Sequence, residues 1–128
     1  MTTPFWCLLV TILLPYVWSG LAGYFRVQQL GSLDNKYPRI QSAQLTGVGA
    51  RAYAAQGNAW EALPVFATSV FVAHFAGADP GTSATLSEVF VVARVVHGIL
   101  YLANLDVLRT LTFFVGFGCC IGLFWISA

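Results

Sequence analysis

Four long apolar stretches alternate with shorter polar connections along the chain. Each stretch holds about 20 mostly apolar residues, the length that a helix needs to cross the hydrocarbon core of a bilayer, which is about 30 Å thick. The pattern predicts membrane-spanning helices at about 4–25, 51–76, 86–104 and 108–127. We therefore expect an all-α membrane protein, a four-transmembrane-helix bundle that forms a single domain over residues 1–128.

The connections differ in length and in the signals that they carry. The first, between residues 26 and 50, is long and polar and holds several turn residues, which is typical of a functional loop. The second contains the turn sequence GADPG, and the third is only a few residues long. Thr85 followed by Glu88 has the spacing of a capping box and predicts the start of the third helix.

Composition supports the membrane assignment. Hydrophobic residues make up 58% of the chain and charged residues 9%, whereas about 25% of an average soluble domain is charged. A small soluble domain could not bury so much apolar surface. A net charge of +1 argues against a nucleic-acid partner. Cys7, Cys119 and Cys120 lie in apolar stretches without metal-ligand spacing, so we expect buried thiols and no metal site.

The basic residues predict the orientation of the chain in the membrane. Arg26, Lys36, Arg39 and Arg51 lie in or beside the first connection, and Arg109 borders the third. The second connection has no lysine or arginine. Because cytoplasmic loops carry the excess of basic residues, we expect the first and third connections in the cytoplasm and both termini outside it.

Two charges, Glu61 and Arg94, fall within predicted spans. Each costs about 2.5–3.5 kcal/mol at the centre of a membrane helix, so such residues are usually functional. Glu61 lies about 15 Å along its helix from Arg51, and Arg94 lies about as far from Asn104. Opposite charges at one depth predict an ion pair, although such a pair can also serve only to fix helix packing.

Helical spacing extends each charge into a polar stripe. The stripe on the second span holds Arg51, Asn58 and Glu61, and the stripe on the third span holds Arg94, His97 and Tyr101. Arg26 and Arg109 lie at the cytoplasmic mouth between the two stripes. Because arginine binds carboxylates through paired hydrogen bonds, this pattern predicts a pocket for an anionic ligand that enters from the cytoplasm.

The segment RAYAAQGNAWEALPVF, from Arg51 to Phe66, resembles a signature of the MAPEG superfamily, the membrane-associated proteins of eicosanoid and glutathione metabolism. The segment from Arg94 to Tyr101, with Arg109 beyond it, is similar to the third and fourth helices of that family. The resemblance covers nearly the whole chain. It implies a homotrimer of four-helix bundles that binds glutathione between subunits. It also implies a bacterial-type member, multi-pass in the inner membrane.

The resemblance also implies roles for individual residues. Arg109 matches the arginine that stabilises the glutathione thiolate and is the candidate catalytic residue. The candidate glutathione-binding residues are Arg26, Arg51, Asn58, Glu61, Arg94, His97 and Tyr101. Among these, Arg94 would orient Glu61. One position departs from the family pattern, because Ala54 stands where glutathione-using members usually carry an arginine.

Three functions follow as hypotheses. The first is a membrane-bound glutathione transferase or peroxidase that takes lipophilic electrophiles from the surrounding lipid, with an arginine-stabilised thiolate. The second, favoured by Ala54, is a non-catalytic lipid-binding or scaffold member of the same fold. The third is a small multidrug transporter; those proteins carry their essential glutamate in the first span, which here is uncharged.

Overall fold

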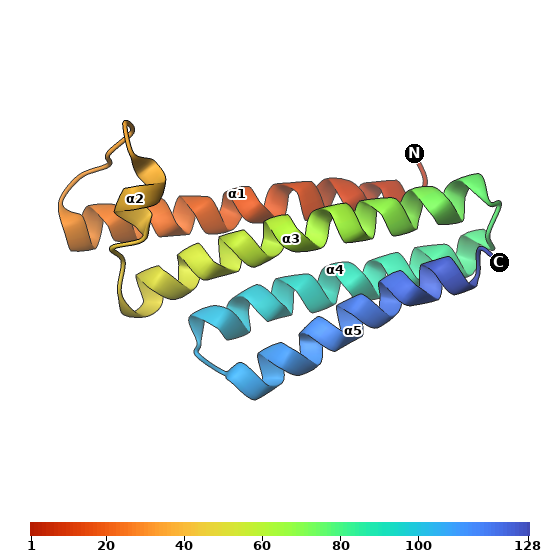
Figure 1. The fold of residues 1–128 in the computed structure, drawn as a ribbon. Helices are drawn as coiled ribbons and strands as arrows, with labels where there is room; N and C mark the ends of the chain where they lie inside the picture. Colours follow the sequence, from red (N-terminus) through yellow and green to blue (C-terminus); the bar gives the residue numbers. More distant parts are fainter.

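The computed structural model describes all residues, 1–128, and shows four long helices with one short helix in the first connection (Figure 1). The elements in chain order are α1 (Thr3–Leu30), α2 (Pro38–Ser42), α3 (Gly47–Phe75), α4 (Pro80–Leu102) and α5 (Asp106–Trp125). Successive long helices run antiparallel, and the two termini lie at the same end of the bundle (Figure 1). The predicted all-α four-helix bundle is confirmed.

The helix boundaries differ from the prediction most at the start of α4. This helix begins at Pro80, six residues before the predicted start at 86. Its cap is Asp79, whose Oδ2 accepts hydrogen bonds of 2.7 Å from the backbone N–H and from the hydroxyl of Thr82. Thr85 instead donates its hydroxyl hydrogen to the carbonyl of Gly81, so the predicted capping box is wrong. Pro80 suits the first helical turn, where no N–H is needed.

Three of the four long helices, α1, α4 and α5, are long and apolar enough to cross a membrane. The fourth, α3, has 29 residues and is about 43 Å long, which exceeds the ~30 Å hydrocarbon thickness. It is less apolar because it carries Arg51, Asn58 and Glu61. Its role as a membrane span stays a prediction, supported by its position beside α1 (Figure 1).

The largest cluster of the hydrophobic core lies in the half of the bundle near the termini. Phe66 of α3 and Phe90 of α4 stack with ring centroids 3.9 Å apart, and Leu123 of α5 is fully buried in the same cluster. Cys7, Cys119 and Cys120 belong to this cluster as buried free thiols, as predicted. This packing joins all four long helices in the half of the bundle near the termini.

Gly98 of α4 permits a close approach between α1 and α4. A Cβ atom on Gly98 would overlap the indole ring of Trp18, which is buried. The absence of a side chain on α4 therefore makes room for the largest side chain of α1 at this level.

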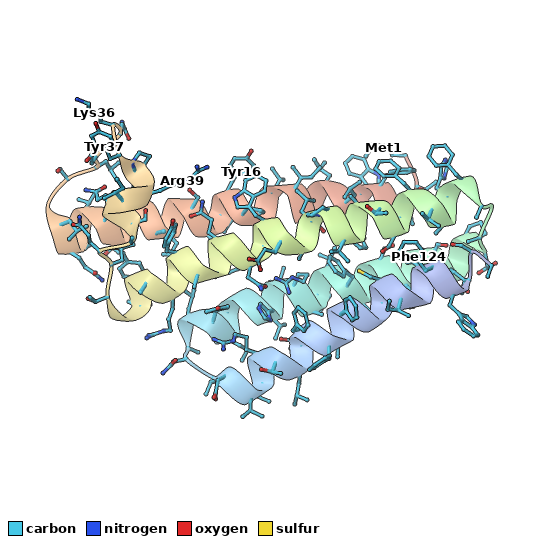
Figure 2. The ribbon with its side chains drawn as sticks, in the orientation of Figure 1. Met1, Tyr16, Lys36, Tyr37, Arg39 and Phe124 are labelled. Carbon is cyan, nitrogen blue, oxygen red and sulfur yellow. The ribbon has the colours of Figure 1, made fainter.

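The first connection folds into an ordered structure beside the end of α1. Gln41 of α2 donates from Nε2 to the carbonyl of Ser32 at 2.7 Å and accepts from the N–H of Asp34 at 3.0 Å. Arg26 of α1 donates to the carbonyl of Pro38 at 3.2 Å. The Gln41 bonds join α2 to the rest of the connection, and the Arg26 bond ties α2 to α1. Figure 2 shows the Arg39 side chain extending from α2 toward the middle of the molecule.

Candidate functional site

The basic residues gather in one half of the bundle, the half closed by the first and third connections (Figure 1). This half contains the end of α1, all of α2, the start of α3, the end of α4 and the start of α5. All six lysines and arginines of the chain belong to it: Arg26, Lys36, Arg39, Arg51, Arg94 and Arg109. The half at the termini has none.

Arg94 is buried between α3 and α4, with 5% of its surface exposed. One of its terminal nitrogens, Nη2, donates to the backbone carbonyl of Asn58 at 3.3 Å and also to the Asn58 side-chain oxygen. Glu61 is exposed and forms no ion pair with Arg94, so the predicted ion pair is wrong. Equal depth along two helices did not place the two charges face to face, because the rotation of α3 turns Asn58 toward Arg94.

His97 is also buried, and it contacts the start of α5. Its Nδ1 donates to the carbonyl of Arg109 at 3.0 Å, and the hydroxyl of Thr112 donates to the same carbonyl at 2.8 Å. The other ring nitrogen, Nε2, is buried without a hydrogen-bond partner. His97 therefore positions the first turn of α5, and with it Arg109.

Arg109 stacks on Tyr101 across the short third connection. The guanidinium carbon lies 4.2 Å from the centroid of the Tyr101 ring, within the range of a cation–π interaction. Tyr101 lines the groove described below, whereas Arg109 does not. Within one chain, Arg109 therefore contacts a residue that lines the groove but does not line the groove itself.

Two cavities meet along α3. The larger, here called the polar groove, has a volume of about 580 Å3; its lining includes Arg39, Tyr53, Gln56, Asn58, Glu61 and Tyr101. The smaller, here called the apolar cavity, has a volume of about 150 Å3 and is walled mainly by Val65, Phe90, Phe113 and Phe117. Asn58 and Glu61 line both cavities, and Arg94 lines the apolar cavity.

Arg51 and Arg26 lie beside the polar groove rather than in it. Arg51 donates from Nε to the carbonyl of Leu102 at 3.0 Å, which satisfies a carbonyl left free at the end of α4. Arg26 lines an adjoining cavity of about 210 Å3 that also includes Arg39 and Gln56. The Nε of Arg26 is buried without a hydrogen-bond partner.

The structure thus brings only part of the predicted set together. Asn58, Glu61 and Tyr101 share the polar groove, and Arg94 contacts it through Asn58. The binding roles of all these residues stay predictions. Sequence reasoning missed Gln56 and Tyr53, because the groove covers a wider arc of α3 than the single stripe through Asn58. It also missed Arg39, which reaches the groove from a connection whose fold the sequence pattern does not reveal.

Long apolar helices with a polar groove along α3 define a multi-pass membrane protein. The family model of the MAPEG family matches residues 3–128, and the chain therefore belongs to the MAPEG family, a family of membrane glutathione transferases and peroxidases. No curated protein and no solved structure matches the chain. The family resemblance seen in the segments around Asn58 and Arg94 is confirmed.

Proposed function

We propose that this protein is a membrane-bound glutathione transferase or peroxidase that acts on lipophilic electrophiles. The observation that carries the proposal is the junction of the polar groove with the apolar cavity at Asn58 and Glu61. A transferase of this kind must hold a polar thiol beside an apolar acceptor, and the two cavities offer a compartment for each. Proximity of the two reactants is itself a large part of catalysis.

The groups that line the polar groove fit glutathione, a charged tripeptide. Arg39 offers a guanidinium for a carboxylate, and Glu61 offers a carboxylate for an ammonium group. The amides of Gln56 and Asn58 can each donate and accept hydrogen bonds, as peptide groups require. The volume of about 580 Å3 falls within the range of roughly 300–1,000 Å3 that is usual for small-molecule sites.

Glutathione would supply the thiol that attacks the electrophile. In our proposal the Arg109 guanidinium stabilises the thiolate, because a neighbouring positive charge lowers the pKa of a thiol. Tyr101 and His97 hold Arg109 in place through the ring contact and through its carbonyl. Arg109 does not line the groove of its own chain, so we propose a homotrimer in which it serves the groove of a neighbouring protomer.

Membrane lipids and the lipophilic substrate are the other proposed partners. Exposed apolar side chains cover much of α1 and α5, among them Leu13, Val17, Phe114 and Ile121, as expected of surfaces in contact with lipid or with other protomers. With the basic half of the bundle in the cytoplasm, the polar groove opens toward soluble glutathione. We propose a bacterial inner-membrane location with both termini outside the cytoplasm.

A non-catalytic lipid-binding role is the alternative function. Two observations favour it: Ala54 brings no charge to the groove, and Arg109 lies outside the groove of its own chain. In that case the apolar cavity would hold a lipid chain and the polar groove would contact its head group.

One experiment separates the two functions. Protein purified in detergent is titrated with glutathione by calorimetry and assayed for conjugation of glutathione to chlorodinitrobenzene, and the purified sample is extracted for lipids. The transferase proposal predicts binding and conjugation. Absence of both, together with a stoichiometric bound lipid, would overturn it in favour of the alternative.

A further inference from the structure

The polar groove contains a single cationic side chain, and that side chain does not come from a long helix. Arg39 lies on α2, the short helix of the first connection, and is the only lysine or arginine among the residues that line the groove. We propose that Arg39 is the anchor for the C-terminal carboxylate of the thiol ligand in this groove. The inference rests on the proposed function, because it concerns how the same groove holds its thiol ligand.

The guanidinium of Arg39 is free to bind. The side chain is exposed, and it makes no hydrogen bond or ion pair with the rest of the chain. By contrast, Arg51, Arg94 and Arg109 are engaged with Leu102, Asn58 and Tyr101. A planar guanidinium with unused donors matches a carboxylate in two parallel hydrogen bonds.

The adjacent face of α3 cannot supply the cation itself. Ala50, Ala54 and Gly57 line this part of the groove and have no group that binds an anion. Their small size leaves the space over α3 open to a side chain from outside the helix. Arg39 reaches this space, so the positive charge of the groove comes from α2.

The first connection holds Arg39 in position before a ligand arrives. The residue before it, Pro38, receives the hydrogen bond from Arg26. Two residues after it, the side-chain amide of Gln41 donates a hydrogen bond to Ser32 and accepts one from Asp34. A fixed backbone reduces the conformational entropy that binding would otherwise cost.

Charge along the groove then specifies the class of ligand. Arg39 and Arg26 make the end beside α2 positive, because both line the adjoining cavity, and Glu61 supplies the carboxylate where the groove meets the apolar cavity. The complementary ligand carries both charges, with its C-terminal carboxylate at Arg39 and its ammonium group toward Glu61. A peptide-like thiol with a free carboxylate meets this requirement.

The test compares glutathione with its monoethyl ester, in which the glycyl carboxylate is blocked, by calorimetric titration of the full-length protein in detergent. We expect the wild type to bind glutathione more tightly than the ester. Arg39→Ala should weaken glutathione binding by about tenfold to a hundredfold, the equivalent of a charged hydrogen bond. The variant should bind glutathione and the ester alike. Arg39→Gln, which keeps a long polar side chain, should show the same loss if the alanine variant folds poorly.

Two further variants make the result specific. Lys36→Ala is the matched control, since Lys36 is a basic residue of the same connection that does not line the groove; it should leave the preference for glutathione unchanged. Ala54→Arg in the Arg39→Ala background returns a cation to the groove and should restore much of the affinity. If the wild type binds glutathione and Arg39→Ala keeps both its affinity and its preference, the inference is wrong and the proposed function stands. No binding of glutathione by the wild type overturns both.

Discussion

Arg94 on α4 donates hydrogen bonds to both the backbone and the side-chain oxygen of Asn58 on α3. The contact joins two helices in the middle of the basic half and places a buried charge against neutral partners. It also lies where the polar groove and the apolar cavity adjoin, since Asn58 lines both. The same contact thus supports the fold and shapes the candidate site.

Asn58→Ala should destabilise the protein, because it removes the side-chain acceptor of a buried guanidinium. A hydrogen bond to a charged group contributes about 1.5–3 kcal/mol, and we expect a loss of stability of this size. Thermal or chemical unfolding in detergent measures it. Arg94→Met combined with Asn58→Ala should cost less than the sum of the two single changes; an additive result would show that the contact carries no coupling energy.

Gly98→Ala should force α1 and α4 apart. The new methyl group would overlap the Trp18 ring, and overpacking of this kind costs about 1–3 kcal/mol. Gly20→Ala is the control, because Gly20 is an exposed helical position with nothing within 4 Å of an added Cβ. The thermal midpoint in detergent should fall for Gly98→Ala and stay level or rise for Gly20→Ala. Equal midpoints would contradict the close approach.

The Asp79 cap should make part of the stability depend on pH. The backbone N–H of Thr82, together with its hydroxyl, lowers the pKa of Asp79 below the ordinary aspartate value. A carboxylate with a lowered folded-state pKa stabilises the fold above its unfolded-state pKa, and this contribution is lost as pH falls through the folded-state value. Asp79→Ala should therefore lower the thermal midpoint at neutral pH. The difference from the wild type should shrink in acid; a difference independent of pH would argue against an ionised cap.

Arg109→Ala should separate thiolate formation from binding. If Arg109 stabilises the thiolate of bound glutathione, its removal should raise the pKa of that thiol by at least about one unit, or about 1.4 kcal/mol. The ultraviolet absorbance of the thiolate, followed against pH, reports this change. Calorimetry at neutral pH should show that Arg109→Ala lowers the affinity for glutathione less than Arg39→Ala does. An unchanged thiol pKa would show that Arg109 does not stabilise the thiolate.

Labelling of single cysteines should establish the orientation. Asn35→Cys places a thiol in the first connection, and Ala76→Cys places one between α3 and α4. The native cysteines are buried and should react little. A membrane-impermeant maleimide added to intact cells should label Ala76→Cys, whereas Asn35→Cys should react only after the cells are opened. The reverse pattern would invert the proposed topology.

Some features of the site were accessible from the sequence. The motif around Asn58 and Glu61 and the segment around Arg94 pointed to the correct family, and helical spacing placed Asn58 near Glu61. The partner of Arg94 was not predictable in the same way. Helical spacing gives depth along a helix, but which of two side chains on adjacent turns faces a neighbour depends on how the helices are rotated when they pack.

The sequence by itself determined that four long helices form, because a run of apolar residues of bilayer length satisfies its backbone hydrogen bonds internally and needs no tertiary partner for them. It also determined that the basic residues gather in one half, since that follows from where they stand relative to the helix ends. Only the tertiary structure decided that Arg94 meets Asn58 rather than Glu61, and that Arg39 reaches the groove from α2. These contacts join residues far apart in the chain, and they depend on helix rotation and on the fold of a connection, neither of which is encoded in local periodicity.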